Sequence, residues 1–274
     1  MKAGIIGGTG KMGRLFSGVF DRAGYDVLVS GRSTTRTALE LAEHCDIVIV
    51  SVPIRATVNV IRTIAPVMRE DQLLCDFTSL KTRPVEAMLG SKAQVIGLHP
   101  MFGPTVKSLR HQTLIACPAR ADVRTRDRLL DIFRNEGAVI SITSPEDHDR
   151  MMAVVQGLTH FVTLTMAESV RKLGIDIAKT KAFTSPVYQI ELSLVGRLLS
   201  QDPVLYADIL ELNPYIPEAL LACTKSGAEL RKIIGTGNPD AFRDFFLGNS
   251  RHFGVYCEEG VETTDALIEC MVNR

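Results

Sequence analysis

Short apolar runs alternate with longer stretches of mixed polarity over the first half of the chain. Such runs predict strands that are buried on both faces, and the stretches between them are long enough for crossover helices. The alternation is typical of an α/β domain with a doubly wound parallel sheet. We expect strands at residues 2–7, 26–30, 46–52, 72–77, 94–98, 113–116 and 138–142, and a helix at 123–134.

The pattern changes to a helical period after about residue 143. Ser144 suits an N-cap, Pro145 suits the first helical position, and two acids follow in the first turn. Arg171-Lys172 and then Gly174 are typical of a helix end. No strand pattern follows, so residues 1–144 are expected to form a Rossmann-type α/β domain and residues 145–274 an all-helical second domain. Further helices are expected at 186–200, 203–213, 217–235, 239–257 and 261–272.

The amino-acid composition excludes some classes of binding partner for this chain. Its 274 residues suit two domains, and 31 Lys and Arg balance 31 Asp and Glu, so no overall field attracts nucleic acid or a membrane surface. Six scattered cysteines form no metal or disulfide motif, and no leader or membrane-spanning pattern is present. We expect a cytoplasmic protein that binds a small-molecule substrate and no metal. Helices such as 154–170 are apolar over much of their circumference, which favours a homodimer.

A glycine-rich turn connects the first predicted strand to the first predicted helix. It comprises Gly8, Thr9, Gly10, Lys11, Met12 and Gly13. In a dinucleotide site the first glycine makes the tight turn, the second lets the backbone approach the pyrophosphate, and the third packs helix on strand. The phosphates would lie at the helix N-terminus. A purely structural glycine turn is the alternative.

The residues at the end of the second predicted strand indicate which nicotinamide cofactor the chain prefers. Ser30 stands where an NAD site usually offers a carboxylate to the ribose, and Arg32, Ser33, Thr34 and Arg36 supply donors for a 2′-phosphate. We therefore expect NADP in preference to NAD, although these arginines could also be a solvated loop. Ser51, Val52 and Pro53 end the third strand at the same sheet edge, where the cofactor lies in doubly wound folds, although Pro53 could simply end that strand.

A second group of polar residues follows the later strands. His99 lies at a strand end within G-L-H-P-M-F-G-P (97–104), and Ser79 and Lys81 follow the fourth strand. On the first long helix, Asp149, Ala153, Gln156 and His160 are expected on one face, with His148 about 100° away.

Together these segments resemble the prephenate/arogenate dehydrogenase family, and the resemblance covers essentially the whole chain. It rests on the glycine turn and on T-S-L-K (78–81), H-P-M-F-G-P (99–104), E-D-H-D (146–149), Q-G-L-T-H-F (156–161), S-P-V-Y-Q-I-E-L (185–192), V-G-R-L (195–198) and Q-D-P (201–203). The resemblance implies a stand-alone dehydrogenase, without the chorismate mutase or regulatory segments of some members.

The resemblance also implies a reaction and roles for residues. Such enzymes oxidise the ring carbinol of prephenate by hydride transfer to a nicotinamide, and loss of carbon dioxide gives 4-hydroxyphenylpyruvate. His99 would accept the proton of the hydroxyl, Ser79 would orient that hydroxyl or the imidazole, and Arg197 would hold a substrate carboxylate.

Four further residues are candidates for substrate binding, with alternatives. His148 and His160 would line the site or be satisfied by local hydrogen bonds. Gln189 lies on the helical face of Arg197, where some relatives carry a basic residue, and Lys81 would position cofactor or substrate or be a helix-start charge.

Alternative functions differ in the substrate or in the class of protein. Arogenate or 4-amino-4-deoxyprephenate could replace prephenate. Another NADP reductase, for example a deazaflavin-dependent one, shares the glycine turn but not the H-P-M-F-G-P string. A non-catalytic NADP-sensing regulator would bind cofactor without turnover.

Overall fold

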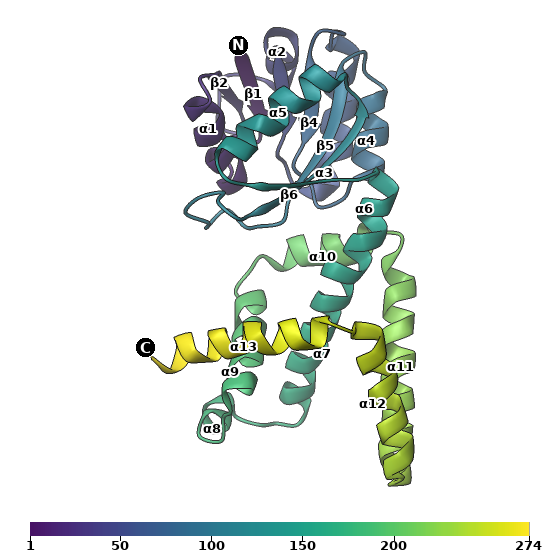
Figure 1. Ribbon diagram of the computed structural model, residues 1–274. Coiled ribbons are helices and arrows are strands. Elements are labelled where there is room, and N and C mark those ends of the chain that lie inside the picture. Colours follow the sequence, from purple (N-terminus) through teal and green to yellow (C-terminus); the bar gives the residue numbers. More distant parts are fainter. Residues whose placement is uncertain (274) are drawn as a thin grey trace. The chain divides into compact units, whose positions relative to one another are not determined.

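The computed structural model describes residues 1–273, and a seven-stranded sheet dominates their first half (Figure 1). The strand order is β2-β1-β3-β4-β5-β6-β7. All seven strands predicted from the sequence are confirmed, with shifts of a few residues at their ends. They are β1 (Lys2–Ile6), β2 (Asp26–Ser30), β3 (Ile47–Val50), β4 (Leu73–Asp76), β5 (Gln94–Pro100), β6 (Thr113–Arg120) and β7 (Val139–Ile142).

The direction of the last two strands corrects the expectation of a wholly parallel sheet. Strands β1 to β5 are parallel, but β6 pairs antiparallel with β5, and β7 pairs parallel with β6. The cause is the connection at 101–112, which contains no helix, because a parallel return needs a longer crossover. Helix α5 (Val123–Asn135) provides that crossover between β6 and β7.

Helices cover both faces of the sheet, as the doubly wound prediction requires. One core cluster joins the sheet to α1 (Lys11–Arg22) and α5 through Phe16, Phe20 and Phe133. The other joins it to α2 (Ala38–His44), α3 (Ile54–Ile64) and α4 (Thr82–Leu89), with a short 3₁₀ turn (Ala65–Val67) after α3. The sheet is therefore buried on both sides, which explains why its strands read as continuous apolar runs.

The strand register brings the candidate site together at one edge. Ile6 pairs with both Ser30 and Val50, and Val50 pairs with Asp76. These residues end or nearly end four neighbouring parallel strands, so the loops that follow them leave the sheet at the same edge. That edge is the carboxyl end of the strands, where ligands bind in open α/β sheets.

The described chain separates into two compact packing units. The sheet unit comprises Met1–Ala153 and Ala207–Pro214, and the helical unit comprises Val154–Tyr206 and the chain from Tyr215 onward. Helix α6 (Pro145–Met152) belongs to the sheet unit, and Ser144 caps it as predicted by accepting from the N–H of Asp147. The domain boundary at 144/145 stays a prediction.

The helical unit contains no strand among its described residues, as expected. Its helices are α7 (Thr159–Lys172), α8 (Ile177–Lys181), α9 (Pro186–Leu199), the start of α10 (Pro203–Leu212), α11 (Ile216–Thr236), α12 (Pro239–Phe253) and α13 (Tyr256–Val272). The short α8 was missed, and the last two helices divide at Gly254, whose φ of +56° is left-handed. No helix of residues 1–273 is long and apolar enough to cross a membrane.

The long helix predicted from residue 145 is interrupted by a π-helical segment at Ala153–Leu158. Its hydrogen bonds run from residue i to i+5, which inserts an extra residue into the turn. The expectation that Asp149, Ala153, Gln156 and His160 share one regular face is therefore wrong. Helical periodicity alone could not reveal the interruption, because the apolar pattern continues through it.

Candidate active site

The glycine turn after β1 is held by hydrogen bonds to the neighbouring strand β2. The N–H groups of Gly7 and Gly8 donate to the carbonyl of Ser30, at 2.8 and 3.1 Å. Gly7 has a φ of +84°, so the tight turn that the sequence assigned to Gly8 is made by Gly7. A Cβ on Gly7 would lie 2.1 Å from the carbonyl oxygen of Ser51, so the turns after β1 and β3 touch.

The start of α1 fits the phosphates of a dinucleotide. Its N-cap is Gly10, which offers no side chain, and no acid lies in the first turn. The N–H groups of Lys11, Met12 and Gly13 precede the first intrahelical hydrogen bond, donated by Arg14 to Gly10, and so remain available to an anion. A Cβ on Gly13 would lie 2.5 Å from the carbonyl of Gly7, which matches the packing role expected of the third glycine.

The loop after β2 lies against the glycine turn. A Cβ on Gly31 would meet the Thr9 hydroxyl at 2.5 Å, and the N–H of Gly31 donates to Thr34 Oγ1 at 2.8 Å. The side chains of Arg32, Ser33 and Arg36 are exposed on this loop and make no hydrogen bond or ion pair within residues 1–273. The loop therefore presents the guanidinium group of Arg32, unpaired among the described residues, next to the glycine turn.

The loop after β3 completes this group of turns. The N–H of Ser51 donates to the carbonyl of Ile6 at 2.7 Å, which ties the end of β3 to the end of β1. Val52 follows, and Pro53 takes the N-cap position of α3. The predicted cofactor residues of the first three turns thus lie together at the carboxyl edge of the sheet.

A buried chain of hydrogen bonds runs from His99 through His148 to Asp149. His99, on β5, places its Nδ1 2.8 Å from Nε2 of His148, on α6. His148 Nδ1 lies 2.8 Å from a carboxylate oxygen of Asp149. Relative exposure is only 3% for His99, 1% for His148 and 2% for Asp149. The structure thus joins two histidines that lie far apart in the sequence, which we call the histidine relay.

The relay assigns the tautomer of each neutral imidazole. An ionised carboxylate only accepts hydrogen bonds, so His148 donates from Nδ1 and accepts at Nε2. His99 must then donate from Nδ1, which puts the acceptor lone pair of its ring on Nε2. A neutral imidazole with a fixed acceptor nitrogen is the form that a general base requires.

The electrostatic surroundings keep both imidazoles neutral. Burial, together with the charges of His148 and Lys81, holds the pKa of His99 well below its ordinary value. Burial also lowers the pKa of His148, although the hydrogen bond to Asp149 opposes this shift. For Asp149, burial alone would raise the pKa, but the hydrogen bonds it accepts outweigh that effect, so its pKa is lowered and it stays ionised.

Asp149 is itself held by backbone and side-chain donors. Its two carboxylate oxygens accept from the N–H groups of Lys81, at 2.8 Å, and Thr82, at 2.9 Å. Its carbonyl accepts from the side-chain amide of Asn213, at 2.7 Å. The sequence analysis noted Asp149 but did not place it in the site, and it gave no role to Thr82 or Asn213. Only the direct adjacency of Asp149 to His148 could have signalled this arrangement.

Lys81 lies beneath the relay and is completely buried. Its Nζ forms an ion pair with Asp76 and donates to the carbonyl of Leu98 at 2.7 Å. Asp76, at the end of β4, is thereby joined to β5 immediately before His99. Asp76 was missed from the sequence because a carboxylate at a strand end has many structural uses. In residues 1–273 no group of three or more His, Cys, Asp and Glu could hold a metal ion.

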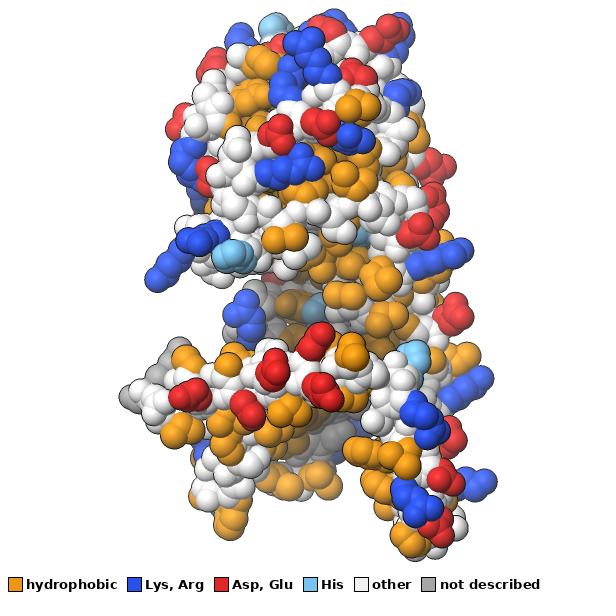
Figure 2. Space-filling view, viewed as in Figure 1, with side chains coloured by type: hydrophobic (Ala, Val, Ile, Leu, Met, Phe, Trp, Pro, Cys, Tyr) orange, Lys and Arg blue, Asp and Glu red, His pale blue; other side chains and the backbone are white. Residues whose placement is uncertain are grey.

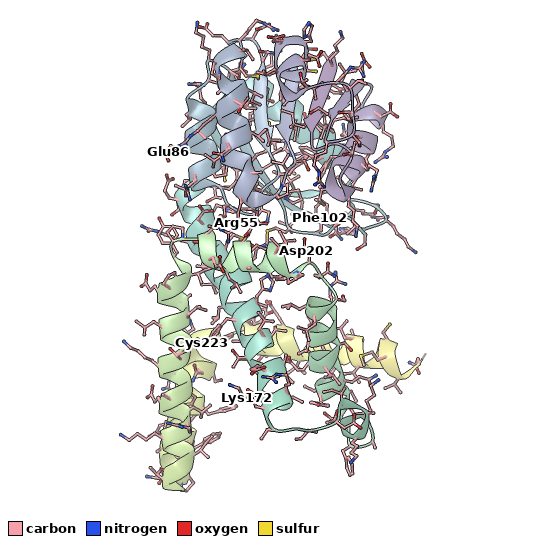
Figure 3. The ribbon with its side chains drawn as sticks, turned by 180° about the vertical axis from the view of Figure 1, so that it is seen from behind. Arg55, Glu86, Phe102, Lys172, Asp202 and Cys223 are labelled. Carbon is pink, nitrogen blue, oxygen red and sulfur yellow. The ribbon has the colours of Figure 1, made fainter. Side chains whose placement is uncertain are left out.

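The loop after His99 is anchored to the sheet core. Phe102, labelled in Figure 3, packs against one core cluster, with its ring centroid 6.3 Å from that of Phe16. Ser79, in the loop after β4, is partly buried. Its side chain makes no hydrogen bond within the described residues, so its predicted role toward His99 stays a prediction.

The remaining candidates belong to the helical unit. His160, on α7, packs its ring at 4.8 Å from that of Tyr206, and burial lowers its pKa. Gln189 and Arg197 are both exposed on α9, eight residues and so about two turns apart on one side of the helix. Their roles toward a substrate stay predictions.

Comparison with known proteins agrees with this architecture. The family model "Prephenate dehydrogenase, nucleotide-binding domain" matches residues 28–142, and "Prephenate dehydrogenase, dimerization domain" matches residues 144–248. The chain is 39% identical over 265 residues to the T-protein of Enterobacter agglomerans, covering 96% of this chain and 70% of that protein. It is 35% identical over 289 residues to the "Probable arogenate/prephenate dehydrogenase" of Methanocaldococcus jannaschii, covering 98% of this chain and 65% of that protein.

A solved structure supports the fold. Prephenate dehydrogenase from A. aeolicus, in complex with hydroxyphenyl propionate and NAD⁺, superposes with a TM-score of 0.74 at 20% identity, covering 92% of this chain and 98% of that chain. The present chain belongs to the prephenate/arogenate dehydrogenase family of oxidoreductases. It spans about two thirds of the length of the two relatives named above.

Proposed function

We propose that this protein catalyses the oxidative decarboxylation of prephenate to 4-hydroxyphenylpyruvate in tyrosine biosynthesis, with NADP as the hydride acceptor. The observation that carries the proposal is the histidine relay, which holds a neutral imidazole at the sheet edge used by dinucleotide sites. Family membership supplies the class of reaction, and the relay supplies the base which that reaction needs.

The chemistry assigned to the relay is proton removal from the ring hydroxyl. A nicotinamide held at the glycine turn would accept the hydride from the ring carbinol carbon, and the electron pair of the bond to the ring carboxylate would stay in the ring as carbon dioxide leaves. His99 Nε2 accepts the hydroxyl proton, and the resulting imidazolium still donates from Nδ1 to His148. Asp149 remains ionised at the far end, so its negative charge stabilises the cation without taking its proton.

The substrate contacts follow the sequence predictions with two changes. We assign His148 to the relay instead of to the substrate, because both of its ring nitrogens are already hydrogen-bonded to His99 and Asp149. Arg197 would bind a substrate carboxylate, Gln189 and His160 would line the substrate site, and Ser79 would orient the hydroxyl or the His99 ring. For Lys81 we infer a positioning role instead of a substrate contact. Its ammonium is fully buried and already bonded to Asp76 and to the carbonyl of Leu98.

The preference for NADP rests on the loop after β2. Ser30 ends that strand without a carboxylate, and its carbonyl supports the glycine turn. Arg32, Ser33 and Arg36 lie exposed on the loop, and among the described residues Arg32 has no acidic partner, whereas Arg36 interacts with Glu40. A 2′-phosphate would supply the missing counter-charge, whereas the ribose hydroxyl of NAD would not.

We further propose that the protein functions as a homodimer formed through the helical unit. Only Gly157, Val195 and Ile216 are buried among its described residues. Large apolar side chains remain exposed along its helices, for example Phe183 at 89% and Phe246 at 63%. Figure 2 shows apolar side chains at the surface of this part of the chain. Exposed apolar surface on this scale is typical of a subunit interface.

The test is an assay of the purified protein with each substrate and each cofactor. Prephenate, arogenate and 4-amino-4-deoxyprephenate are each combined with NAD and NADP, and reduced cofactor is followed by absorbance. The proposal predicts the highest kcat/KM for prephenate with NADP. A preference for either amino compound would transfer the same relay chemistry to that substrate. Cofactor binding without turnover of any of the three would contradict the proposal and favour a cofactor-sensing regulator.

A further inference from the structure

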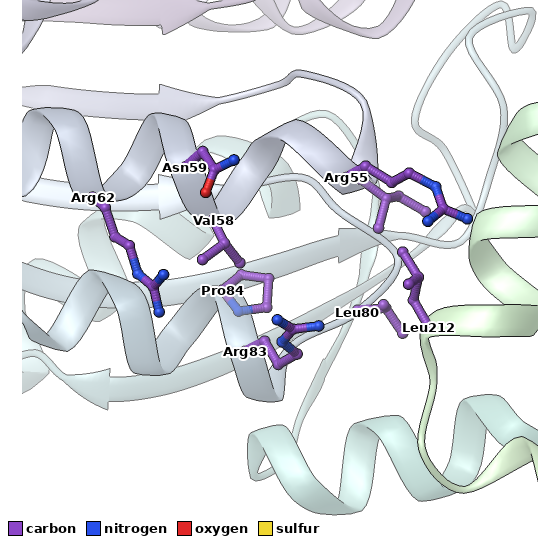
Figure 4. A pocket seen from close by; sticks show the side chains of 9 residues that line it. Arg55, Val58, Asn59, Arg62, Leu80, Arg83, Pro84 and Leu212 are labelled. Carbon is purple, nitrogen blue, oxygen red and sulfur yellow. The ribbon is translucent and has the colours of Figure 1, made fainter.

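A pocket of about 300 Å³ lies outside the candidate active site, between helices α3 and α4 of the sheet unit. Figure 4 shows Arg62 on α3 and Arg83 at the start of α4 extending into the space between the two helices, with Val58 and Pro84 between them. Arg55, Asn59 and Leu212 also line the pocket. Its wall therefore combines guanidinium groups, one amide and apolar surface.

The charges of this pocket are not balanced within the protein. Arg55 is paired with Asp208 at 2.5 Å and with Glu211 at 2.6 Å. Arg62 and Arg83 form no ion pair or side-chain hydrogen bond within residues 1–273. Both side chains are exposed, so their guanidinium groups keep N–H donors to which an anion in the pocket could bind.

We propose that this pocket binds a small organic anion, in which a carboxylate or phosphate is carried on an apolar group. The anionic group would contact Arg62 and Arg83, and its apolar group would lie against Val58 and Pro84. Guanidinium groups bind carboxylate and phosphate through paired hydrogen bonds, which suits either chemistry.

The pocket shares its wall with segments that hold the histidine relay. Leu80 lines the pocket, and the next residue, Lys81, donates its N–H to Asp149. Leu212 also lines the pocket, and the next residue, Asn213, donates to the carbonyl of Asp149. A bound anion would therefore contact residues next to the two donors that fix Asp149. The NMR signals of the His148 ring, which is hydrogen-bonded to Asp149, can then report occupancy of the pocket independently of catalysis.

The test measures binding by isothermal titration calorimetry on the full chain, with three probes. Phenyl phosphate and benzoate carry the two anionic groups on the same apolar ring, and inorganic phosphate lacks the ring. Arg62→Ala/Arg83→Ala removes both unpaired charges. Arg124→Ala is the matched control, because Arg124 is an exposed arginine on α5, a helix on the opposite face of the sheet, and it has no side-chain partner.

We expect at least one aromatic probe to bind the wild-type protein, and to bind about tenfold or more weakly to Arg62→Ala/Arg83→Ala. Arg124→Ala should bind like the wild type, inorganic phosphate should bind more weakly than phenyl phosphate, and the probe should shift the NMR signals of the His148 ring. The tighter of the two aromatic probes identifies the preferred anion. Absence of binding, equal binding by the double variant, or an equal loss in Arg124→Ala would each overturn the proposal.

Discussion

The two packing units stabilise themselves in different ways. The sheet unit buries apolar side chains on both faces of its sheet and also buries a connected polar network, from Lys81 and Asp76 to His99, His148 and Asp149. The helical unit buries almost nothing among its described residues and leaves large apolar side chains exposed. The difference teaches that the sheet unit fixes its polar network with groups of its own chain, whereas the helical unit leaves apolar surface uncovered, which is the basis of the proposed dimer.

The largest effect is expected where the sheet unit performs chemistry. His99→Asn removes the base, whose interaction strengthens as the hydroxyl proton leaves, so kcat should fall by roughly 10²–10⁴-fold with little change in substrate affinity. Steady-state kinetics with prephenate and saturating cofactor measure the change in kcat and in KM. His44→Asn is the control, since His44 is an exposed histidine on α2. A near-normal kcat for His99→Asn would show that the relay is structural only.

The helical unit should respond to changes in its exposed surface, unlike the sheet unit. Sedimentation of the wild type at micromolar concentration should give about twice the chain mass. Phe246→Asp places a charge on the apolar face of α12, and burying an unpaired charge costs several kcal/mol, so the dimer should dissociate. Leu39→Asp changes another exposed apolar residue, on α2 of the sheet unit, and should leave the mass of the dimer unchanged. A fully active wild-type monomer would refute the proposed dimer.

A smaller effect is expected at the loop after β2. Arg32→Ala should weaken NADP binding by about 1.5–3 kcal/mol, the value of a hydrogen bond to a charged group, and should hardly affect NAD. Fluorescence titration with both reduced cofactors measures the difference. Arg14→Ala is a control on the nearby helix α1. Equal losses of binding free energy for the two cofactors in Arg32→Ala, or tighter binding of NAD than of NADP by the wild type, would contradict the proposed preference for NADP.

The smallest effect is a pH dependence of stability that arises in the sheet unit. His99 and His148 have pKa values below about 6.5 in the folded protein, so just below that pH the unfolded chain binds more protons. The free energy of unfolding should therefore fall as the pH drops below about 6.5, and should be largest above it. Urea unfolding at pH 7.5 and 5.5 tests this, and a smaller loss is expected in His99→Asn. Stability that is independent of pH in this window would contradict the buried neutral pair.

Much of the sheet unit could be predicted because local sequence determines it. The bounds of β2, Asp26–Ser30, were predicted without error, because its apolar run stands between the polar Asp26 and Ser30 and pairs along its whole length with β1. The direction of β6 could not be derived in the same way, since it depends on whether residues 101–112 form a helix. The turn glycine was misassigned because Gly7 and Gly8 are adjacent and only one of them has a positive φ.

The residues of the candidate site could be predicted from the sequence, but the hydrogen bonds that connect them could not. The strand-end position of His99 and the helix position of His148 were visible in the sequence, yet 49 residues separate them, and only the tertiary fold brings their rings together. Lys81 looked like a ligand-binding charge because burial of a lysine is rare, and its partner Asp76 is recognisable only in three dimensions.

The central claim is that the relay holds His99 neutral, with its acceptor nitrogen at Nε2. The most direct measurement is ¹⁵N NMR of the histidine rings in the full chain, at pH 7.5 and again at pH 6.0. The account predicts that His99 and His148 are both neutral and protonated on Nδ1 at pH 7.5, that His99 is still neutral at pH 6.0, and that Asp149→Asn disturbs this pattern. An imidazolium at His99, or a neutral ring protonated on Nε2, would contradict the account.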